Sequence, residues 1–196
     1  MLRNMKLSID DSVSPHIPLK TTDPDYIANL MFSNGKIRAF DEGREPQMLL
    51  PREECPRVQQ IAKKERFGLD KDGKPVSKNR VYQLRDAIAE PIINKFYEDP
   101  TLISFGEDVR DWGGAFAVYR GMTEAIPYHR LFNAPIAEAG IVGAAVGYAM
   151  AGGRVVAELM YCDFLGRSGD EVFNQLSKWQ SMSAGMLKMP VVLRLS

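Results

Sequence analysis

The fold is decided by a long, nearly uncharged stretch that reads Leu131-Phe132-Asn133-Ala134-Pro135-Ile136-Ala137-Glu138-Ala139-Gly140-Ile141-Val142-Gly143-Ala144-Ala145-Val146-Gly147. An apolar pair opens it, and small residues dominate it after Pro135. This pattern predicts a short strand at 131–132, followed by a helix over 135–151. The many glycines and alanines, together with the Asn and Pro start, favour a buried helix over a membrane span.

Segments on either side of this stretch alternate between strand-like and helix-like patterns. Helices are predicted over 81–97 and 169–182, strands over 101–105, 155–161 and 191–195, and a glycine-bearing loop over 111–128. Alternation of this kind predicts an α/β fold, with a mostly parallel sheet and helices on both faces. Because the last predicted strand is followed by no turn, we expect this domain to be incomplete at its C-terminal side.

The first part of the chain has a different character. Prolines punctuate residues 1–79, only 57–67 has a helical pattern, and 70–74 has the composition of a turn. We therefore divide the chain into an irregular N-terminal extension, 1–79, and a partial α/β domain, 80–196. The extension is interpreted as a connector or an arm that wraps a partner, with a mobile tail as the alternative.

Composition excludes several classes of protein. The 196 residues carry 25 basic and 25 acidic side chains, and 45% of them are hydrophobic. A formal net charge of zero is not typical of a nucleic-acid-binding protein. Two distant cysteines favour a reduced, cytoplasmic compartment, and no targeting or membrane segment is predicted. Two histidines and no His/Cys cluster predict no metal site in this chain.

Glu138 is the strongest candidate for chemistry, because it is the only charged residue between Arg130 and Arg154. A carboxyl group in an apolar setting at a helix start is suited to sharing a proton. An ordinary first-turn glutamate that stabilises free amides is the alternative. The small residues at three- and four-residue spacing from Gly140 to Ala151 form a face for close helix packing, either within the domain or at an interface.

Several motifs together resemble a known family. They are Gly106-Glu107-Asp108-Val109, Gly113-Gly114-Ala115-Phe116, Arg120-Gly121, the stretch 132–147, Glu158-Leu159-Met160-Tyr161-Cys162-Asp163-Phe164 and Asn174-Gln175-Leu176-Ser177-Lys178. In combination they look like the E1 component β subunit of 2-oxo acid dehydrogenases, over about 82–195. The matching part is the transketolase-like pyrimidine-binding domain, which binds thiamine diphosphate.

The resemblance implies a role for each matching residue. Glu138 would hydrogen-bond N1′ of the cofactor's aminopyrimidine ring and favour the imino tautomer that removes the thiazolium C2 proton. Phe164 would stack on the ring, Met160 would line its pocket, and Ile136 would contact it through the backbone. Glu107 matches an acidic position near the paired active sites. The ordinary alternatives are core packing for the apolar residues and a strand-end carboxylate for Glu107.

The resemblance also implies an assembly. The diphosphate and its Mg²⁺ would be held by an E1 α-type, pyrophosphate-binding domain or subunit that is not in this chain. A second β-type domain and a lipoyl-bearing E2 would be further partners. The implied reaction is oxidative decarboxylation of a 2-oxo acid, with acyl transfer to a lipoyl carrier. The alternatives are a truncated, non-catalytic fragment or association subunit, and another transketolase-like thiamine-diphosphate enzyme.

Overall fold

The computed structural model of the chain describes residues 48–64, 67–76 and 83–196. Its described sheet consists of the strands β1 (Leu102–Gly106), β2 (Leu131–Asn133), β3 (Arg154–Glu158) and β4 (Val191–Arg194), in the order β2-β1-β3-β4. Each neighbouring pair runs parallel. The predicted α/β fold with a parallel sheet is therefore confirmed.

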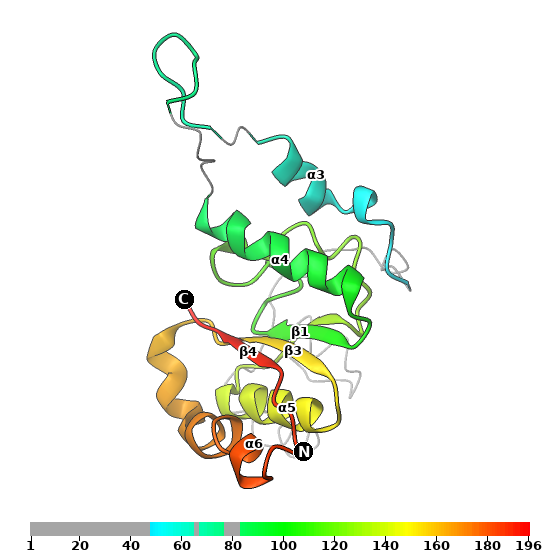
Figure 1. Cartoon of the computed structure of the whole chain (residues 1–196), viewed down its shortest axis with the longest axis vertical. Coiled ribbons are helices and arrows are strands. Elements are labelled where there is room, and N and C mark those ends of the chain that lie inside the picture. The colour runs from blue at the N-terminus through cyan, green and yellow to red at the C-terminus, as the bar shows by residue number, and fades with distance from the viewer. Residues whose placement is uncertain (1–47, 65–66, 77–82) are drawn as a thin grey trace, which may run out of the picture. The chain divides into compact units, whose positions relative to one another are not determined.

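Helices cover both faces of this sheet. Helix α4 (Leu84–Glu98) lies on one face and α5 (Glu138–Met150) on the other (Figure 1). Strand β3 contributes side chains to both faces of the sheet. Val156 joins the buried cluster of α4, while Val155 and Ala157 join that of α5. Side chains alternate between the faces of a strand, so a continuous apolar run fills both layers.

Helix α5 begins at Glu138, three residues later than predicted. The backbone N–H of Ala134 donates to the carbonyl of Gly106 at 2.8 Å, which keeps the chain beside β1 after β2 has ended. Ala137, which precedes the first helical residue, has a non-helical φ of −156°. The proline therefore belongs to the approach to the helix, and Glu138 lies at its first position.

The region between β3 and β4 contradicts the predicted single helix over 169–182. It contains a 3₁₀-helix η3 (Cys162–Ser168), a π-helix η4 (Glu171–Leu176) and a short helix α6 (Trp179–Met182). In the π-helix, the N–H of Ser177 donates to the carbonyl of Val172, five residues earlier. This wider turn rotates the apolar face, so Phe173 is exposed while Leu176 packs against the cluster of α5.

Part of the predicted extension packs on the α/β core. A 3₁₀ turn, η1 (Arg52–Glu54), leads into α3 (Pro56–Ala62), which ends earlier than the predicted helix over 57–67. Arg57 and Asp86 of α4 form a buried ion pair at 3.0 Å, and Ile61 joins the cluster of α4. Residues 1–47 lie outside the described residues, so the interpretation of that part stays a prediction.

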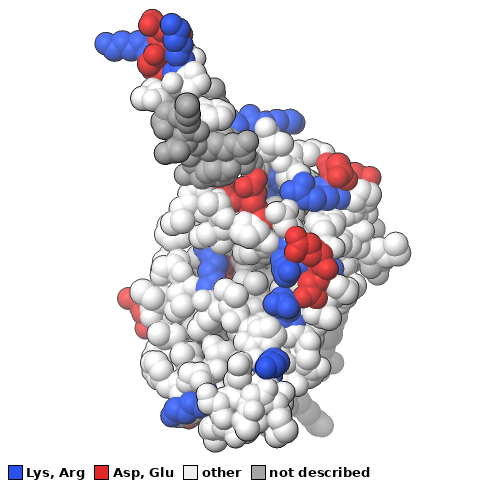
Figure 2. All heavy atoms as spheres, in the orientation of Figure 1, with Lys and Arg blue, Asp and Glu red and all other residues white. Residues whose placement is uncertain are grey.

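The predicted turn at 70–74 is present. The Asp70 carboxylate accepts the backbone N–H groups of Asp72 at 2.9 Å and Lys74 at 2.8 Å, which closes the turn. Acidic and basic side chains lie together at this turn (Figure 2).

An apolar groove of about 590 Å³ separates α4 from β3 and β4, with Ile88, Ile92, Val156 and Val191 in its lining. Strand β4 is the edge of the described sheet, and Val192 on it is exposed. An exposed apolar edge strand can pair with another chain.

Candidate functional site

The candidate site lies where the chain leaves the carboxyl ends of β1 and β3. The connection after β1 packs on the α4 side through Val109, Tyr119 and Met122, whereas the connection after β3 packs on the α5 side through Leu165 and Leu176. The two connections thus diverge to opposite faces from adjacent strands. Open parallel sheets bind their ligands at such a divergence.

Glu158 ends β3 and is completely buried at this edge. Its Oε1 accepts the backbone N–H of Ala115 at 2.6 Å, and its Oε2 pairs with Arg194 at the end of β4. Arg194 also donates to the carbonyl of Ala115 at 2.8 Å. Burial raises the pKa of Glu158, while the Ala115 N–H and the Arg194 charge oppose that rise. This pair fastens the loop after β1 to two strands.

Gly114 makes the close approach to Glu158 possible. It adopts a φ of +68°, and a Cβ placed there would lie 2.6 Å from Oε1 of Glu158. Only glycine tolerates both the left-handed backbone and the proximity of the carboxylate. Gly114, which lies in one of the motifs that carry the family resemblance, therefore also has a local structural reason.

Glu138 places a second buried carboxyl group at the same edge. It is the first residue of α5 and is 4% exposed. The Arg167 Nε atom of η3 lies 3.0 Å from its Oε2, which makes an ion pair, but the two are not aligned as a hydrogen bond. Within the part of the chain that the structure describes, Oε2 has no hydrogen-bond donor. A carboxylate is favoured at a helix N-terminus, so burial there is tolerable.

Glu107 adds a third buried carboxyl group, directly after β1. Burial, followed by the charges of Glu138 and Asp108, raises the pKa of Glu107. Its Oε1 atom is buried and accepts no hydrogen bond from the described residues. The loop after β1 and the start of α5 therefore bring two carboxyl groups within electrostatic reach of each other, a pattern common at functional sites.

The predicted cofactor-binding residues differ in their exposure and in their contacts. Phe164 belongs to η3, as Arg167 does, so the ion pair that reaches Glu138 comes from the segment that carries the aromatic ring. Phe164 is 37% exposed and meets Tyr161 edge-on, with ring centroids 6.1 Å apart. Met160 is half-buried, and its carbonyl accepts the hydroxyl of Ser196. Ile136 is 80% exposed and directs no side chain into the core.

These residues suit the aminopyrimidine half of thiamine diphosphate. The ring would need a buried carboxyl group with free hydrogen-bonding capacity, and Oε2 of Glu138 has it. It would also need an accessible aromatic face, which Phe164 offers. Among residues 48–64, 67–76 and 83–196, no three His, Cys, Asp or Glu side chains lie together as potential metal ligands. Glu138 and Phe164 thus offer the carboxyl group and the aromatic face that the ring would need.

Sequence reasoning missed Arg167 and the partnership of Glu158 with Arg194. Arg167 resembles any solvated arginine in the sequence, since nothing near it marks a partner 29 positions earlier. Glu158 lies in the middle of the predicted strand over 155–161, and Arg194 lies near the end of the predicted strand over 191–195. In the structure β3 already ends at Glu158, which brings its carboxylate beside the end of β4.

Comparison with known proteins gives a consistent result. The family described as "Transketolase, pyrimidine binding domain" matches residues 81–196. The β subunit of acetoin:2,6-dichlorophenolindophenol oxidoreductase from Cupriavidus necator is 38% identical over 59% of this chain and 37% of its own length. The pyruvate dehydrogenase E1 component subunit beta from Leifsonia xyli is 40% identical over 50% of this chain and 29% of its own. The mitochondrial pyruvate dehydrogenase E1 component subunit beta from Homo sapiens is 36% identical over 57% of this chain and 31% of its own length.

The matches cover the α/β part and about a third of the length of these relatives, from 29% to 37%. The predicted resemblance to E1 β subunits is thereby confirmed. No helix in the described ranges is long and apolar enough to cross a membrane. The relatives include proteins named as mitochondrial and chloroplastic, so the cytoplasmic location stays a prediction.

Proposed function

The chain belongs to the transketolase pyrimidine-binding domain family, and from this premise we propose that it supplies the aminopyrimidine half of a thiamine-diphosphate site in an E1-type 2-oxo acid dehydrogenase. The reaction is oxidative decarboxylation of a 2-oxo acid, with acyl transfer to a lipoyl carrier. The observation that carries this proposal is the buried carboxyl group of Glu138, which stands at the start of α5 with Oε2 free of hydrogen bonds from the described residues.

Thiamine diphosphate, when bound, supplies the nucleophilic carbon and the electron sink for decarboxylation. The residues of this chain position it and handle a proton. Glu138 holds a proton at N1′ of the ring, which favours the imino tautomer of its exocyclic nitrogen. Phe164 offers its accessible face for stacking, Met160 lines the pocket, and the exposed backbone at Ile136 contacts the ring edge.

The remaining parts of the site come from partners. An E1 α-type, pyrophosphate-binding domain or subunit holds the diphosphate and Mg²⁺, and a second β-type domain completes the pair. The lipoyl-bearing E2 accepts the acyl group. Exposed apolar side chains support an assembly, since Phe173, Met182 and Met186 lie open in the layer of α5. The lower part of the face in Figure 2, which holds that layer, carries few charges.

Two other functions are open to test. The acetoin-named relatives favour a thiamine-diphosphate enzyme of the same family that uses a donor other than a 2-oxo acid. The exposed positions 140, 144 and 147 on α5 favour a non-catalytic association subunit, because small residues allow close helix packing. Turnover of a 2-oxo acid by the assembled protein separates both from the main proposal.

The decisive variant is Glu138→Ala in the chain assembled with an α-type subunit. We expect reductive acylation of a lipoyl acceptor to fall by about 100-fold or more, because the proton relay is lost. The fold survives, as circular dichroism would show. The control is Glu98→Ala, which removes an exposed carboxylate of α4 and leaves activity unchanged. Wild-type turnover by Glu138→Ala would refute the assignment.

A second experiment tests the division of the site between chains. Calorimetry on the chain alone should detect only weak binding of thiamine diphosphate, with no gain from Mg²⁺, because the diphosphate has no partner here. Tight, Mg²⁺-dependent binding without a partner would contradict the proposed half-site.

A further inference from the structure

Arg167 and Glu138 form an unequal ion pair. Glu138 is 4% exposed and fixed at the first position of a 13-residue helix. The Arg167 side chain is 73% exposed and projects from the 3₁₀-helix η3. Glu138 is therefore buried and fixed in place, whereas Arg167 reaches it from the solvent.

The buried partner needs a counter-ion. A carboxylate removed from water is costly unless an opposite charge or hydrogen bonds compensate it. Glu107 lies within electrostatic reach of Glu138 and repels its carboxylate, whereas Arg167 pairs with it. Arg167 thus offsets the repulsion that Glu107 adds.

The exposed partner is easy to displace. An arginine that stands mostly in water keeps its hydration and loses little when one ion pair opens, so such pairs contribute about 0–1 kcal/mol. The contact at 3.0 Å is also not aligned as a hydrogen bond, which lowers its strength further. Arg167 can therefore hold Glu138 without committing the carboxyl group permanently.

We propose that Arg167 is a positioning residue that acts as a releasable counter-ion of Glu138 and competes with the aminopyrimidine ring for its carboxyl group. This rests on the proposed function of Glu138. N1′ of the neutral ring accepts a hydrogen bond, so the carboxyl group must carry a proton, taken from water, when the ring binds. The attraction of the guanidinium to the carboxylate is lost at that moment. Arg167 therefore weakens ring binding while it compensates the charge of Glu138 in the ring-free site.

The test uses the full chain and 4-amino-5-hydroxymethyl-2-methylpyrimidine, a ring with no diphosphate, which requires only this half of the site. Binding at millimolar ring concentrations is followed by NMR. Arg167→Gln should bind the ring about three- to fivefold more tightly than the wild type, since an exposed pair of this kind is removed. Arg167→Lys should restore the wild-type affinity, because it keeps the charge. Added salt should narrow the difference between Arg167→Gln and the wild type.

A double-mutant cycle separates this role from a structural one. Glu138→Ala should weaken binding, because it removes the hydrogen-bond donor to N1′, and adding Arg167→Gln to it should change nothing further, because the group that Arg167 pairs with is gone. Arg85→Gln, which removes a half-exposed guanidinium from α4, is the matched control and should bind like the wild type.

The outcomes distinguish the two proposals. If Glu138→Ala loses binding while Arg167→Gln matches the wild type, the counter-ion role is overturned and the proposed function stands. An Arg167→Gln effect that persists in the Glu138→Ala background also overturns the counter-ion role. If the ring binds none of the proteins, or binds Glu138→Ala as well as the wild type, the proposed function fails and takes this inference with it.

Discussion

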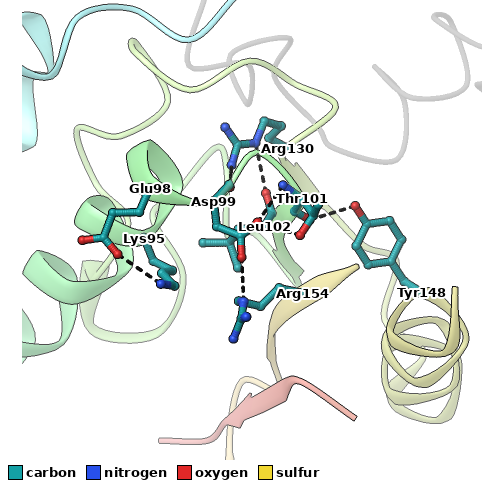
Figure 3. Close-up of polar contacts among 8 residues, drawn as sticks. All are labelled: Lys95, Glu98, Asp99, Thr101, Leu102, Arg130, Tyr148 and Arg154. Carbon is teal, nitrogen blue, oxygen red and sulfur yellow. Dashed lines mark hydrogen bonds and ion pairs between the residues drawn. The ribbon is translucent and has the colours of Figure 1, made fainter. Parts of the chain in front are cut away.

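The two edges of the parallel sheet differ in how well their carboxylates are compensated by hydrogen bonds and opposite charges. At the amino edge, Asp99 accepts hydrogen bonds from Thr101 at 2.7 and 2.9 Å and pairs with Arg154 at 2.7 Å (Figure 3). Arg130 and Tyr148 donate to backbone carbonyls beside it. The Thr101 hydrogen bonds, followed by Arg154, lower the pKa of Asp99 to about 2.

At the carboxyl edge, carboxyl groups are buried with fewer partners. Burial raises the pKa of both Glu107 and Glu158, and Glu107 and Glu138 each keep a buried oxygen without a hydrogen bond from the described residues. The amino edge therefore stabilises its charges locally, whereas the carboxyl edge holds charges that the fold must support from elsewhere. Costly groups of this kind are retained where a ligand or a reaction uses them.

The largest loss of stability is expected at Glu158, on the carboxyl edge. Glu158→Ala leaves Arg194, whose side chain is 10% exposed, without its carboxylate and frees the N–H of Ala115. We expect a loss of about 3–5 kcal/mol in the free energy of unfolding, measured by urea denaturation. Glu98→Ala, in an exposed pair with Lys95, should change it by less than about 0.5 kcal/mol.

If Glu158→Ala fails to fold, Glu158→Leu combined with Arg194→Leu keeps the comparison testable. Replacing both members of a buried pair by apolar residues removes the stranded charge, so this variant should recover much of the lost stability. Equal losses for the double variant and the single one would show that packing, rather than charge, dominates this edge.

Gly114→Ala tests the backbone side of the same edge. The new Cβ would lie 2.6 Å from Glu158 Oε1 at a φ of +68°, so either the loop or the carboxylate must move. We expect thermal unfolding to report a loss of about 2 kcal/mol. Gly73→Ala is the matched control, with a φ of +76° and open space around it. An equal cost at both sites would mean that the carboxylate adds no constraint.

Asp99→Ala tests the amino edge, where the expected effect is about 1 kcal/mol because Arg154 is half-exposed and water screens the pair. The sign with pH follows from the lowered pKa. The folded chain holds Asp99 ionised down to about 2, against an ordinary value of 3.8. Its contribution is therefore full above pH 4 and is lost as the pH falls toward 2. Urea titrations at pH 7 and pH 2.5 should show a clearly smaller cost of the variant at pH 2.5 than at pH 7.

The architecture of the sheet could be predicted because apolar periodicity encodes it. Strands β1 to β4 and helix α4 lie within a few residues of their predicted positions. The predicted start of α5 at 135 and the predicted single helix over 169–182 were wrong. Both regions depend on hydrogen bonds that the apolar periodicity does not encode. The N–H of Ala134 donates to the carbonyl of Gly106 in β1. In the π-helix region, the side-chain amides of Asn174 and Gln175 donate to the carboxylate of Asp170.

The candidate site was only partly predictable. Glu138 stands out because a lone charge in an apolar run is visible in one dimension. Arg167 is not, because its significance comes from a contact that only the packing of η3 on α5 creates. The grouping of Glu107 with Glu138 likewise depends on β1 ending, and α5 beginning, at one edge of the sheet, which no local pattern specifies.

Glu107→Gln tests the carboxyl edge and should have the smallest effect on stability. Unlike the variants above, it should stabilise the chain at pH 7. Burial and the neighbouring charges of Glu138 and Asp108 raise the pKa of Glu107 above its ordinary value of 4.5. A group that holds its proton more tightly in the folded chain stabilises the fold below that value, and this contribution is lost as the pH rises through the folded pKa. Above that range the ionised side chain opposes folding, so Glu107→Gln should be more stable than the wild type at pH 7 and equal to it near pH 4. Asp99→Ala should instead be less stable than the wild type at pH 7, because the Asp99 carboxylate has hydrogen bonds and an ion pair that favour its charged form. A wild type that is the more stable protein at pH 7 would show that the carboxyl edge is as well compensated as the amino edge.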